Sequence, residues 1–264
     1  MKKNILAAAL LVFTAVLCVV YAQDYELVLV GVVKDYRRLP EQNKQNAEFT
    51  FVRLIYNGRI PGYIKNWYTD YPKGDQALVA MLGRSTGAQI AEEPRAIPIL
   101  HPDLFNYPMV YSLEAGQMLL DDPQRKRMRE YLERGGFWMI DDFWGTHEWD
   151  NFESEMRKIF PECKIVDIPQ SHIIFHNFFD IDEVRQIPNV GYATCHDCPT
   201  WELDGYQAKV RGVFDEKGRL MVFINHNTDL MDAAEWADYE PYAYRFSAYS
   251  YRVFTNAVIY GMTH

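Results

Sequence analysis

The sequence predicts one α/β domain, a single doubly wound, mostly parallel sheet with helices on both faces, followed by a C-terminal hairpin and helix. Three observations predict it. Apolar runs of strand length alternate along the chain with amphipathic stretches of helix length. Residues 137–140 are apolar at every position, which is typical of a parallel strand covered on both faces. The sequence contains no internal repeat and no Ser/Gly linker, so we expect one domain over residues 49–264.

The composition is that of an acidic globular protein. Hydrophobic residues make up 48% of the chain and charged residues 24%, which excludes a disordered or low-complexity protein. The formal net charge of −9 disfavours binding to phosphate backbones, so we expect no nucleic-acid partner. The aromatic content of 15% suits a polar small molecule, a glycan or a protein partner.

Residues 1–22 have the features of a signal peptide. Lys2 and Lys3 precede an apolar run over residues 5–20, and small Ala22 lies where a signal peptidase cleaves. We expect cleavage before Gln23 and an exported protein, periplasmic or secreted, with no later membrane span. The alternative is a retained anchor, because the apolar run is only slightly shorter than the roughly 20 residues of a spanning helix.

The first half of the domain is predicted as follows. A polar lead-in, residues 23–48, precedes a strand over residues 51–56, and the turn Asn57-Gly58 ends it. Asp75 is a candidate N-cap for a helix that stops near Gly87.

The next predicted elements also have residues that mark where they begin and end. A second strand covers residues 108–113, and Asp122 with Pro123 opens a helix that ends at Gly135-Gly136. The apolar strand over residues 137–140 and a helix over about 148–159 come next.

The C-terminal part is predicted to contain a strand, a hairpin and a helix. The strand covers residues 164–168, and the hairpin covers residues 207–225 around the turn at residues 215–218. A last helix runs over about 247–260.

Polar side chains follow four of the predicted strands. In open α/β sheets, ligands bind beyond the carboxyl ends of the strands, so these side chains are the candidates for the site. They are Tyr56, Asn57, Trp67 and Asp70 after the first strand, Glu114 after the second, Asp141, Asp142, Trp144 and His147 after the third, and Asn225, His226, Asn227 and Asp229 after the last.

Asp141 and Asp142 are the candidate catalytic pair, with Glu114 as a candidate general base. Adjacent residues of an extended chain point to opposite sides, so one aspartate faces the cleft while the other caps a helix or pairs with an arginine. Asp229 has a structural alternative as the N-cap of a short helix.

His172 and His176 are four residues apart and share a face in either a helix or a strand, which makes a metal half-site. The alternative is a pair of structural histidines, because the segment lacks the glutamate of the H-E-x-x-H motif.

Cys195 and Cys198 have disulfide or redox spacing, and we favour a local disulfide, with zinc or redox chemistry as alternatives. Cys163 then remains unpaired.

Two kinds of motif are missing from the sequence. No G-x-S-x-G or G-x-C-x-G elbow occurs, which argues against a serine or cysteine nucleophile. No Gly-rich phosphate loop occurs either, so no nucleotide or flavin cofactor is expected, and a divalent metal is the cofactor that stays open.

Several long strings resemble a bacterial exported family, the domain of unknown function forty-one fifty-nine. They are RLIYNG at 53–58, WYTDYP at 67–72, PMVYSLEAG at 108–116, GGFWMIDD at 135–142, PQSH at 169–172 and NHNTD at 225–229. The resemblance implies a flavodoxin-like fold similar to class I glutamine amidotransferases, which carry a cysteine nucleophile on an elbow. This chain has no such cysteine, so amidotransferase activity is not expected.

The resemblance also implies a MoxR-type ATPase and a von Willebrand A-domain protein as partners in the envelope.

The sequence leaves three hypotheses for the function of the chain. The first is a pseudo-enzyme module that binds a ligand or partner in the former active-site cleft. The second is a metal-assisted hydrolase that uses His172, His176 and Asp141 or Asp142 as ligands, with Glu114 as base. The third is a structural scaffold whose aromatic rim is an interface.

Overall fold

The structure is a computed structural model, and it describes residues 47–59 and 66–264. The predicted signal peptide and all but the end of the lead-in lie outside the described residues. In the part of the chain that is described, no helix has the length and apolar character needed to cross a membrane.

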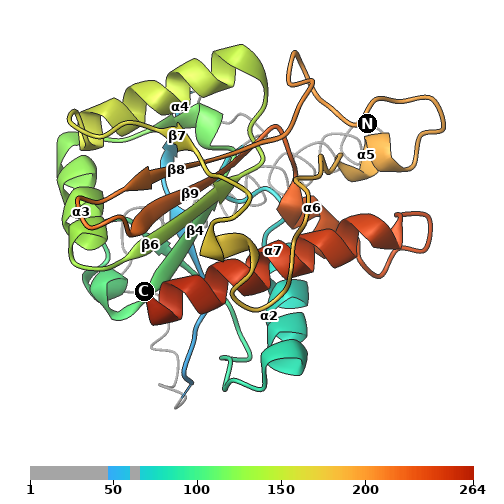
Figure 1. Cartoon of the computed structure of the whole chain (residues 1–264), viewed down its shortest axis with the longest axis horizontal. Coiled ribbons are helices and arrows are strands. Elements are labelled where there is room, and N and C mark those ends of the chain that lie inside the picture. Colours follow the sequence, from blue (N-terminus) through green and yellow to red (C-terminus); the bar gives the residue numbers. More distant parts are fainter. Residues whose placement is uncertain (1–46, 60–65) are drawn as a thin grey trace, which may run out of the picture. The chain divides into compact units, whose positions relative to one another are not determined.

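A seven-stranded sheet with the order β3-β1-β4-β6-β9-β8-β7 forms the centre of the domain (Figure 1). Its first five strands are parallel, and β8 and β9 form an antiparallel hairpin with β7 at the edge. The prediction of a mostly parallel, flavodoxin-like α/β fold is confirmed. The strands are β1 (Val52–Ile55), β3 (Arg95–Pro98), β4 (Met109–Leu113), β6 (Phe137–Asp141), β7 (Val166–Asp167), β8 (Lys209–Phe214) and β9 (Leu220–His226).

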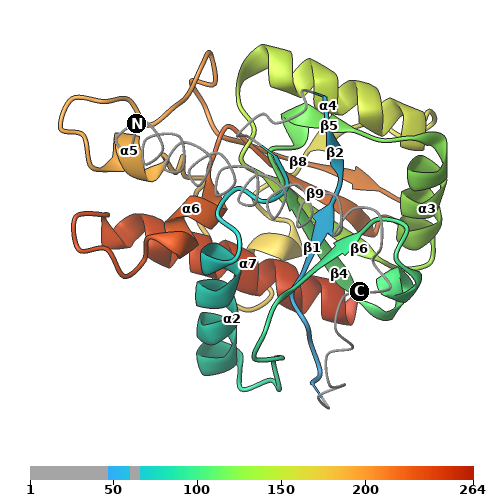
Figure 2. The ribbon, with the colours of Figure 1, turned by 180° about the vertical axis from the view of Figure 1, so that it is seen from behind.

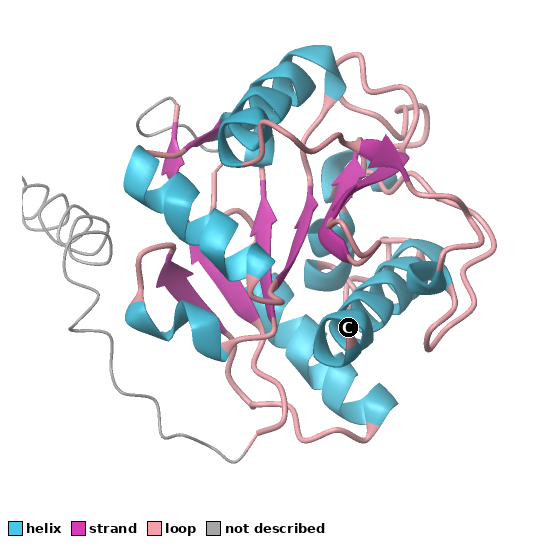
Figure 3. Ribbon diagram, turned by 60° about the vertical axis from the view of Figure 1, so that its left-hand side comes forward, coloured by secondary structure: helices cyan, strands magenta, loops and turns pink. Residues whose placement is uncertain are grey.

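Helices cover both faces of the sheet, as Figures 2 and 3 show. One face carries α2 (Lys73–Thr86), α6 (Leu230–Glu235) and α7 (Tyr244–Thr263), and the other carries α3 (Asp122–Glu133) and α4 (Gly145–Ile159). The connections contain α5 (Val190–Ala193), the 3-10 helices η2 (Pro102–Asn106), η3 (Ala115–Gln117) and η4 (Ile173–Phe175), and a two-stranded ribbon of β2 (Asn57–Gly58) and β5 (Met118–Leu119).

The strands supply two separate hydrophobic cores because neighbouring side chains point to opposite faces. Tyr111 and Met139 pack with α2, α6 and α7, whereas Val110 and Trp138 pack with α3 and α4. All five residues of β6 are buried, which confirms that its apolar run is a strand covered on both faces.

The order of the strands places a switch point between β1 and β4. The chain passes from β1 to β3 on one side and then to β4 on the other side of β1. Ligands of doubly wound sheets bind outside the carboxyl ends of the strands at such a point. The ends of β1, β4 and β6 therefore define where the site is expected.

Several predicted boundaries were wrong. The N-cap of α3 is Asp121, whose side chain accepts a 2.8 Å hydrogen bond from the Gln124 backbone in a capping box, so Asp122 is already helical. Helix α4 begins at Gly145 rather than near residue 148. Strand β3 was not predicted, because its four residues include a proline and lack a continuous apolar run. The predicted end of α2 is confirmed, since Gly87 caps it with a left-handed φ of 69°.

Gly116→Ala is expected to lower the free energy of unfolding by about 1–3 kcal/mol, because its Cβ would lie 2.3 Å from Cβ and 3.0 Å from Cα of Glu148 in α4. Gly83→Ala is the matched control, since nothing lies within 4 Å of its Cβ on α2 and it should gain up to about 1 kcal/mol. Urea denaturation measures both. Equal effects of the two substitutions would contradict the close packing of η3 against α4.

Candidate functional site

Three neighbouring strands end in residues with left-handed backbone. Glu114 follows β4 with φ 53°, Asp142 follows β6 with φ 49°, and Asn227 follows β9 with φ 61°. The Glu114 amide donates to the Asp142 carbonyl at 3.0 Å, and the Asp142 amide donates to the Thr228 carbonyl at 3.0 Å. Non-glycine residues adopt this conformation uncommonly, and such residues cluster at functional sites. The strand ends therefore form one ordered edge.

A fourth left-handed residue, Asp70 with φ 61°, is brought to this edge by Arg53 of β1. Arg53 is fully buried and binds Asp75 of α2 through two hydrogen bonds, of 3.0 and 2.5 Å. Its Nη1 donates to the carbonyls of Trp67 at 3.0 Å and Thr69 at 2.5 Å. The arginine thus fixes the backbone immediately before Asp70.

Arg53 also has aromatic neighbours. Its guanidinium carbon lies 5.3 Å from the ring centroid of Tyr111 and 5.6 Å from that of Tyr71. Cation–π contacts of this kind stabilise a desolvated charge. The sequence analysis missed Arg53, although an arginine between Val52 and Leu54 in a predicted buried strand is a signal for a buried ion pair.

We define the acidic cluster as Asp70, Asp142, Asp229, Asp232 and Glu235. One carboxylate oxygen from each of Asp70, Asp142 and Asp229 lies within 4.8 Å of the others, and Asp70 forms a second such group with Asp232 and Glu235. Although Asp70 is partly exposed as a residue, its Oδ2 atom is buried and has no hydrogen-bond partner. The cluster therefore brings several carboxylates close together at the strand-end edge.

The pKa values reflect this crowding. Burial, and after it the charge of Asp142, raises the pKa of both Asp70 and Asp229 well above the usual range of a carboxyl group. Burial also raises the pKa of Asp232 to about 7, against the lowering effect of a hydrogen bond from the Val190 amide. Near neutral pH the cluster is expected to hold protons or a cation.

Asp141 and Asp142 have different surroundings. Asp141 accepts a hydrogen bond from the Tyr111 hydroxyl and another, of 2.7 Å, from the Leu230 amide at the start of α6. Burial raises its pKa to about 8. Both Asp141 oxygens thus have protein partners, so this residue has a structural place, whereas Asp142 belongs to the acidic cluster.

Trp144 holds the Asp142 carboxylate through a hydrogen bond. Its indole Nε1 donates to Oδ1 of Asp142 at 3.0 Å, and its amide donates to Glu148 at 2.6 Å. Trp144, a candidate for the site, has no exposed surface and therefore offers no face to a ligand in this structure. Its role in the structure is to orient a carboxylate.

Other residues of the predicted rim are engaged within the fold. The Tyr56 hydroxyl donates to the carbonyls of Leu113 and Glu114 at 2.6 and 3.0 Å, and exposed Asn57 pairs with Leu119 between β2 and β5. Trp67 is half-buried against Tyr71.

The residues after β9 hold the start of α4. Asn227 accepts a 2.8 Å hydrogen bond from the Gly145 amide, and His226 Nε2 donates to the Gly145 carbonyl at 3.2 Å. Asn225 donates to the Ile140 carbonyl at 3.4 Å. His147 is exposed on the first turn of α4. Asp229 caps α6 by accepting a 2.9 Å hydrogen bond from the Asp232 amide. It is therefore both the predicted N-cap and a residue of the strand-end edge.

The two candidate metal-ligand histidines lie elsewhere. The His172 ring packs 5.6 Å from Phe214, which pairs with Leu220 at the start of β9, whereas Asp141 and Asp142 follow the carboxyl end of the parallel strand β6. His176 contacts Asp180 at 3.0 Å and the Gln170 carbonyl at 2.8 Å. The structure therefore does not bring these histidines to Asp141 or Asp142, and they have structural partners.

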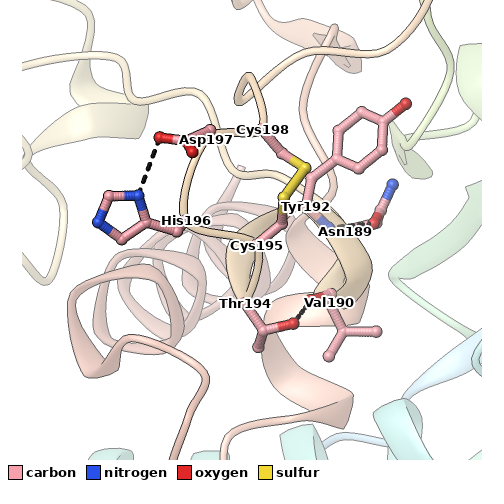
Figure 4. Close-up of a disulfide and its surroundings, with 8 residues drawn as sticks. All are labelled: Asn189, Val190, Tyr192, Thr194, Cys195, His196, Asp197 and Cys198. Atoms are coloured by element: carbon pink, nitrogen blue, oxygen red, sulfur yellow. Dashed lines mark hydrogen bonds and ion pairs between the residues drawn. A yellow bond between two sulfur atoms is a disulfide. The ribbon is translucent and has the colours of Figure 1, made fainter.

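Cys195 and Cys198 form a disulfide directly after α5 (Figure 4). The amide of Val190, at the start of α5, donates to the carboxylate of Asp232. The disulfide loop therefore follows the short helix that contacts the acidic cluster. Cys163 is free and half-buried.

Sequence reasoning found Asp70, Asp142 and Asp229, and it missed Asp232 and Glu235. Its prediction of Asp75 as an N-cap was wrong, because α2 has Pro72 at its N-cap and Asp75 lies in the first turn, where it binds Arg53. Asp232 lies three residues after a predicted N-cap, a spacing that places it over the same helix start. That spacing was an available signal for Asp232. The sequence gives no comparable signal for Glu235.

The fold and the strand-end edge define a flavodoxin-like α/β domain in which a glutamate follows β4 and carboxylates gather beyond β6 and β9. The chain belongs to the family described as Domain of unknown function (DUF4159), whose model matches residues 50–262. No curated protein matches the chain.

Asp75→Asn is expected to lower the free energy of unfolding by about 3–5 kcal/mol, because it leaves the buried Arg53 charge without its carboxylate. The control is Glu130→Gln, which breaks the exposed pair with Arg134 and should cost less than about 0.5 kcal/mol. Urea denaturation compares the two. A loss below 1 kcal/mol for Asp75→Asn would show that Arg53 does not depend on this pair.

His226→Gln is expected to flatten the dependence of stability on pH. Burial lowers the pKa of His226 to about 4, whereas an unfolded histidine has a pKa of about 6.5. The unfolded state therefore binds more protons between these values, and His226 reduces stability as the pH falls from about 6.5 to about 4, by up to about 3 kcal/mol. The unfolding free energy is measured across this range. His147→Gln, which changes an exposed histidine, should leave the pH dependence as it is, and an unchanged slope in His226→Gln would refute the assignment.

Proposed function

We propose that this chain is an exported binding module of the bacterial envelope that recognises a polar ligand or a partner protein at the carboxyl ends of its parallel strands. The observation that carries the proposal is the residue after β4. The class I glutamine amidotransferases that the chain resembles carry a cysteine nucleophile on an elbow, whereas no such elbow occurs in this sequence and the residue after β4 is Glu114, buried and left-handed. A carboxylate at this point supports binding and gives no thiol for acyl transfer.

The chemistry of the edge supports recognition of hydroxyl groups or amides. Carboxylates are hydrogen-bond acceptors, and oxygens of Asp70, Asp142 and Asp229 lie within 4.8 Å of one another. Partly exposed aromatic rings lie close in sequence to Asp70, since Trp67 and Tyr68 pack edge to face with ring centroids 5.7 Å apart. A neutral, donor-rich ligand such as a glycan fits this combination better than an anion does.

The alternatives from the sequence are supported less well. The hydrolase hypothesis used His172 and His176 as ligands, and these side chains are engaged with Phe214, Asp180 and Gln170 instead. A pure scaffold would not need an acidic edge with raised carboxyl pKa values. The MoxR-type ATPase and the von Willebrand A-domain protein remain our proposed candidates among protein partners.

The test compares binding by the secreted chain and by two aspartate variants. Asp142→Asn keeps the shape of the side chain at the edge, and Asp150→Asn changes an exposed aspartate of α4 as the matched control. We expect co-purification with envelope proteins or binding to envelope glycans, with at least a tenfold loss for Asp142→Asn and none for Asp150→Asn.

Two results would count against this function. One is equal binding by wild type and Asp142→Asn, which would place the interface elsewhere. The other is ammonia release from glutamine that Glu114→Gln abolishes, which would make the domain an active amidohydrolase.

A further inference from the structure

We propose that Asp70, Asp142 and Asp229 bind a calcium ion. The inference rests on the proposed function in that it names a ligand of the same strand-end edge. Their grouped oxygens lie within 4.8 Å of one another. Ca²⁺ binds oxygen at about 2.3–2.6 Å, so ligands on opposite sides of the ion are up to about 5 Å apart. The spacing accommodates calcium.

A second, independent observation points to a ligand. Oδ2 of Asp70 is buried and has no hydrogen-bond partner. A buried carboxylate oxygen without a partner is costly, because it has lost its water and gained nothing in exchange. The hydrogen bonds of Arg53 go to Asp75 and to the carbonyls of Trp67 and Thr69, so Arg53 fixes the loop without a hydrogen bond to this oxygen. A bound cation would supply the missing partner.

The other two carboxylates are held in place by neighbours, as metal ligands commonly are. Trp144 Nε1 holds one oxygen of Asp142 at 3.0 Å, and the Asp232 amide holds one oxygen of Asp229 at 2.9 Å. In each of these residues one carboxylate oxygen belongs to the group that lies within 4.8 Å. Fixing both side chains before binding reduces the conformational entropy lost on coordination.

The donor set selects the kind of ion. All three residues supply carboxylate oxygen, which suits hard cations such as calcium, magnesium and manganese rather than zinc or copper. Three carboxylates at one ion favour calcium over magnesium, which keeps most of its water shell and uses one or two carboxylates. Water or hydroxyl groups of a glycan then complete the calcium shell.

The experiment measures thermal unfolding of the full mature chain, from residue 23, against calcium concentration after treatment with chelator. We expect the Tm to rise and saturate, with half-saturation at about 10⁻⁵–10⁻³ M, and magnesium to be at least tenfold weaker. Asp70→Asn should need at least tenfold more calcium, and Asp150→Asn should behave as the wild type. In chelator, Asp70→Asn should be folded and at least as stable as the wild type, because it removes a carboxylate that lies beside those of Asp142 and Asp229.

A spectroscopic measurement locates the ion. Terbium, a luminescent substitute for calcium, should show emission sensitised by the indole of Trp144, and calcium should displace it. Terbium emission is expected to fall at least tenfold at equal concentration in Asp70→Asn. The proposal is overturned if calcium leaves the Tm of the wild type unchanged, or if Asp70→Asn responds to calcium and terbium as the wild type does.

The two proposals fail in different ways. If ligand or partner capture depends on Asp142 but is the same in calcium and in chelator, and calcium does not change the Tm, the calcium site is refuted and the binding module stands. If calcium binds through Asp70 but Asp142→Asn captures as much ligand or partner as the wild type, the calcium site stands and the proposed function is refuted.

Discussion

Arg53 lies within β1 without exposed surface, and its guanidinium joins three separate parts of the fold: the sheet, the first turn of α2 and the loop before Asp70. A buried charge is tolerated only where its partners compensate for the lost hydration, so the loop and α2 have little freedom to move while Arg53 is ionised. This constraint helps to place Asp70, whose own carbonyl accepts a 2.9 Å hydrogen bond from the Gly74 amide. The acidic cluster therefore depends on an ion pair that belongs to the core.

The two adjacent aspartates after β6 show how the fold separates structure from function. Both carboxyl oxygens of Asp141 accept hydrogen bonds, from the Tyr111 hydroxyl and from the Leu230 amide at the start of α6, which ties β4 and α6 to β6. Asp142 takes a left-handed conformation and faces Asp70 and Asp229. Burial of these like charges disfavours ionisation, which is the reason that the pKa values of Asp70 and Asp229 rise. Binding of a cation would favour the ionised carboxylates again. The raised pKa values of the edge are therefore connected to its proposed ligand.

The sequence was sufficient for the fold class and for the location of the edge. Alternating strands and helices, together with the apolar run of β6, predict a covered parallel sheet, and the rule for strand ends then leads to Asp70, Asp142 and Asp229. The sequence did not predict the directions in which individual side chains point. Trp144 turns inward to hold Asp142, which composition at a strand end does not indicate. His172 and His176 have the spacing of a metal half-site, but spacing does not say at which end of the sheet a loop lies.

The most direct test is anomalous diffraction from terbium-soaked crystals of the chain from residue 23. One strong peak is expected between the carboxylates of Asp70, Asp142 and Asp229, with Arg53 still bound to Asp75 and to the loop carbonyls. Peaks confined to exposed acidic side chains, or an Asp70 carboxylate bound to a protein donor in an edge that excludes the ion, would contradict it.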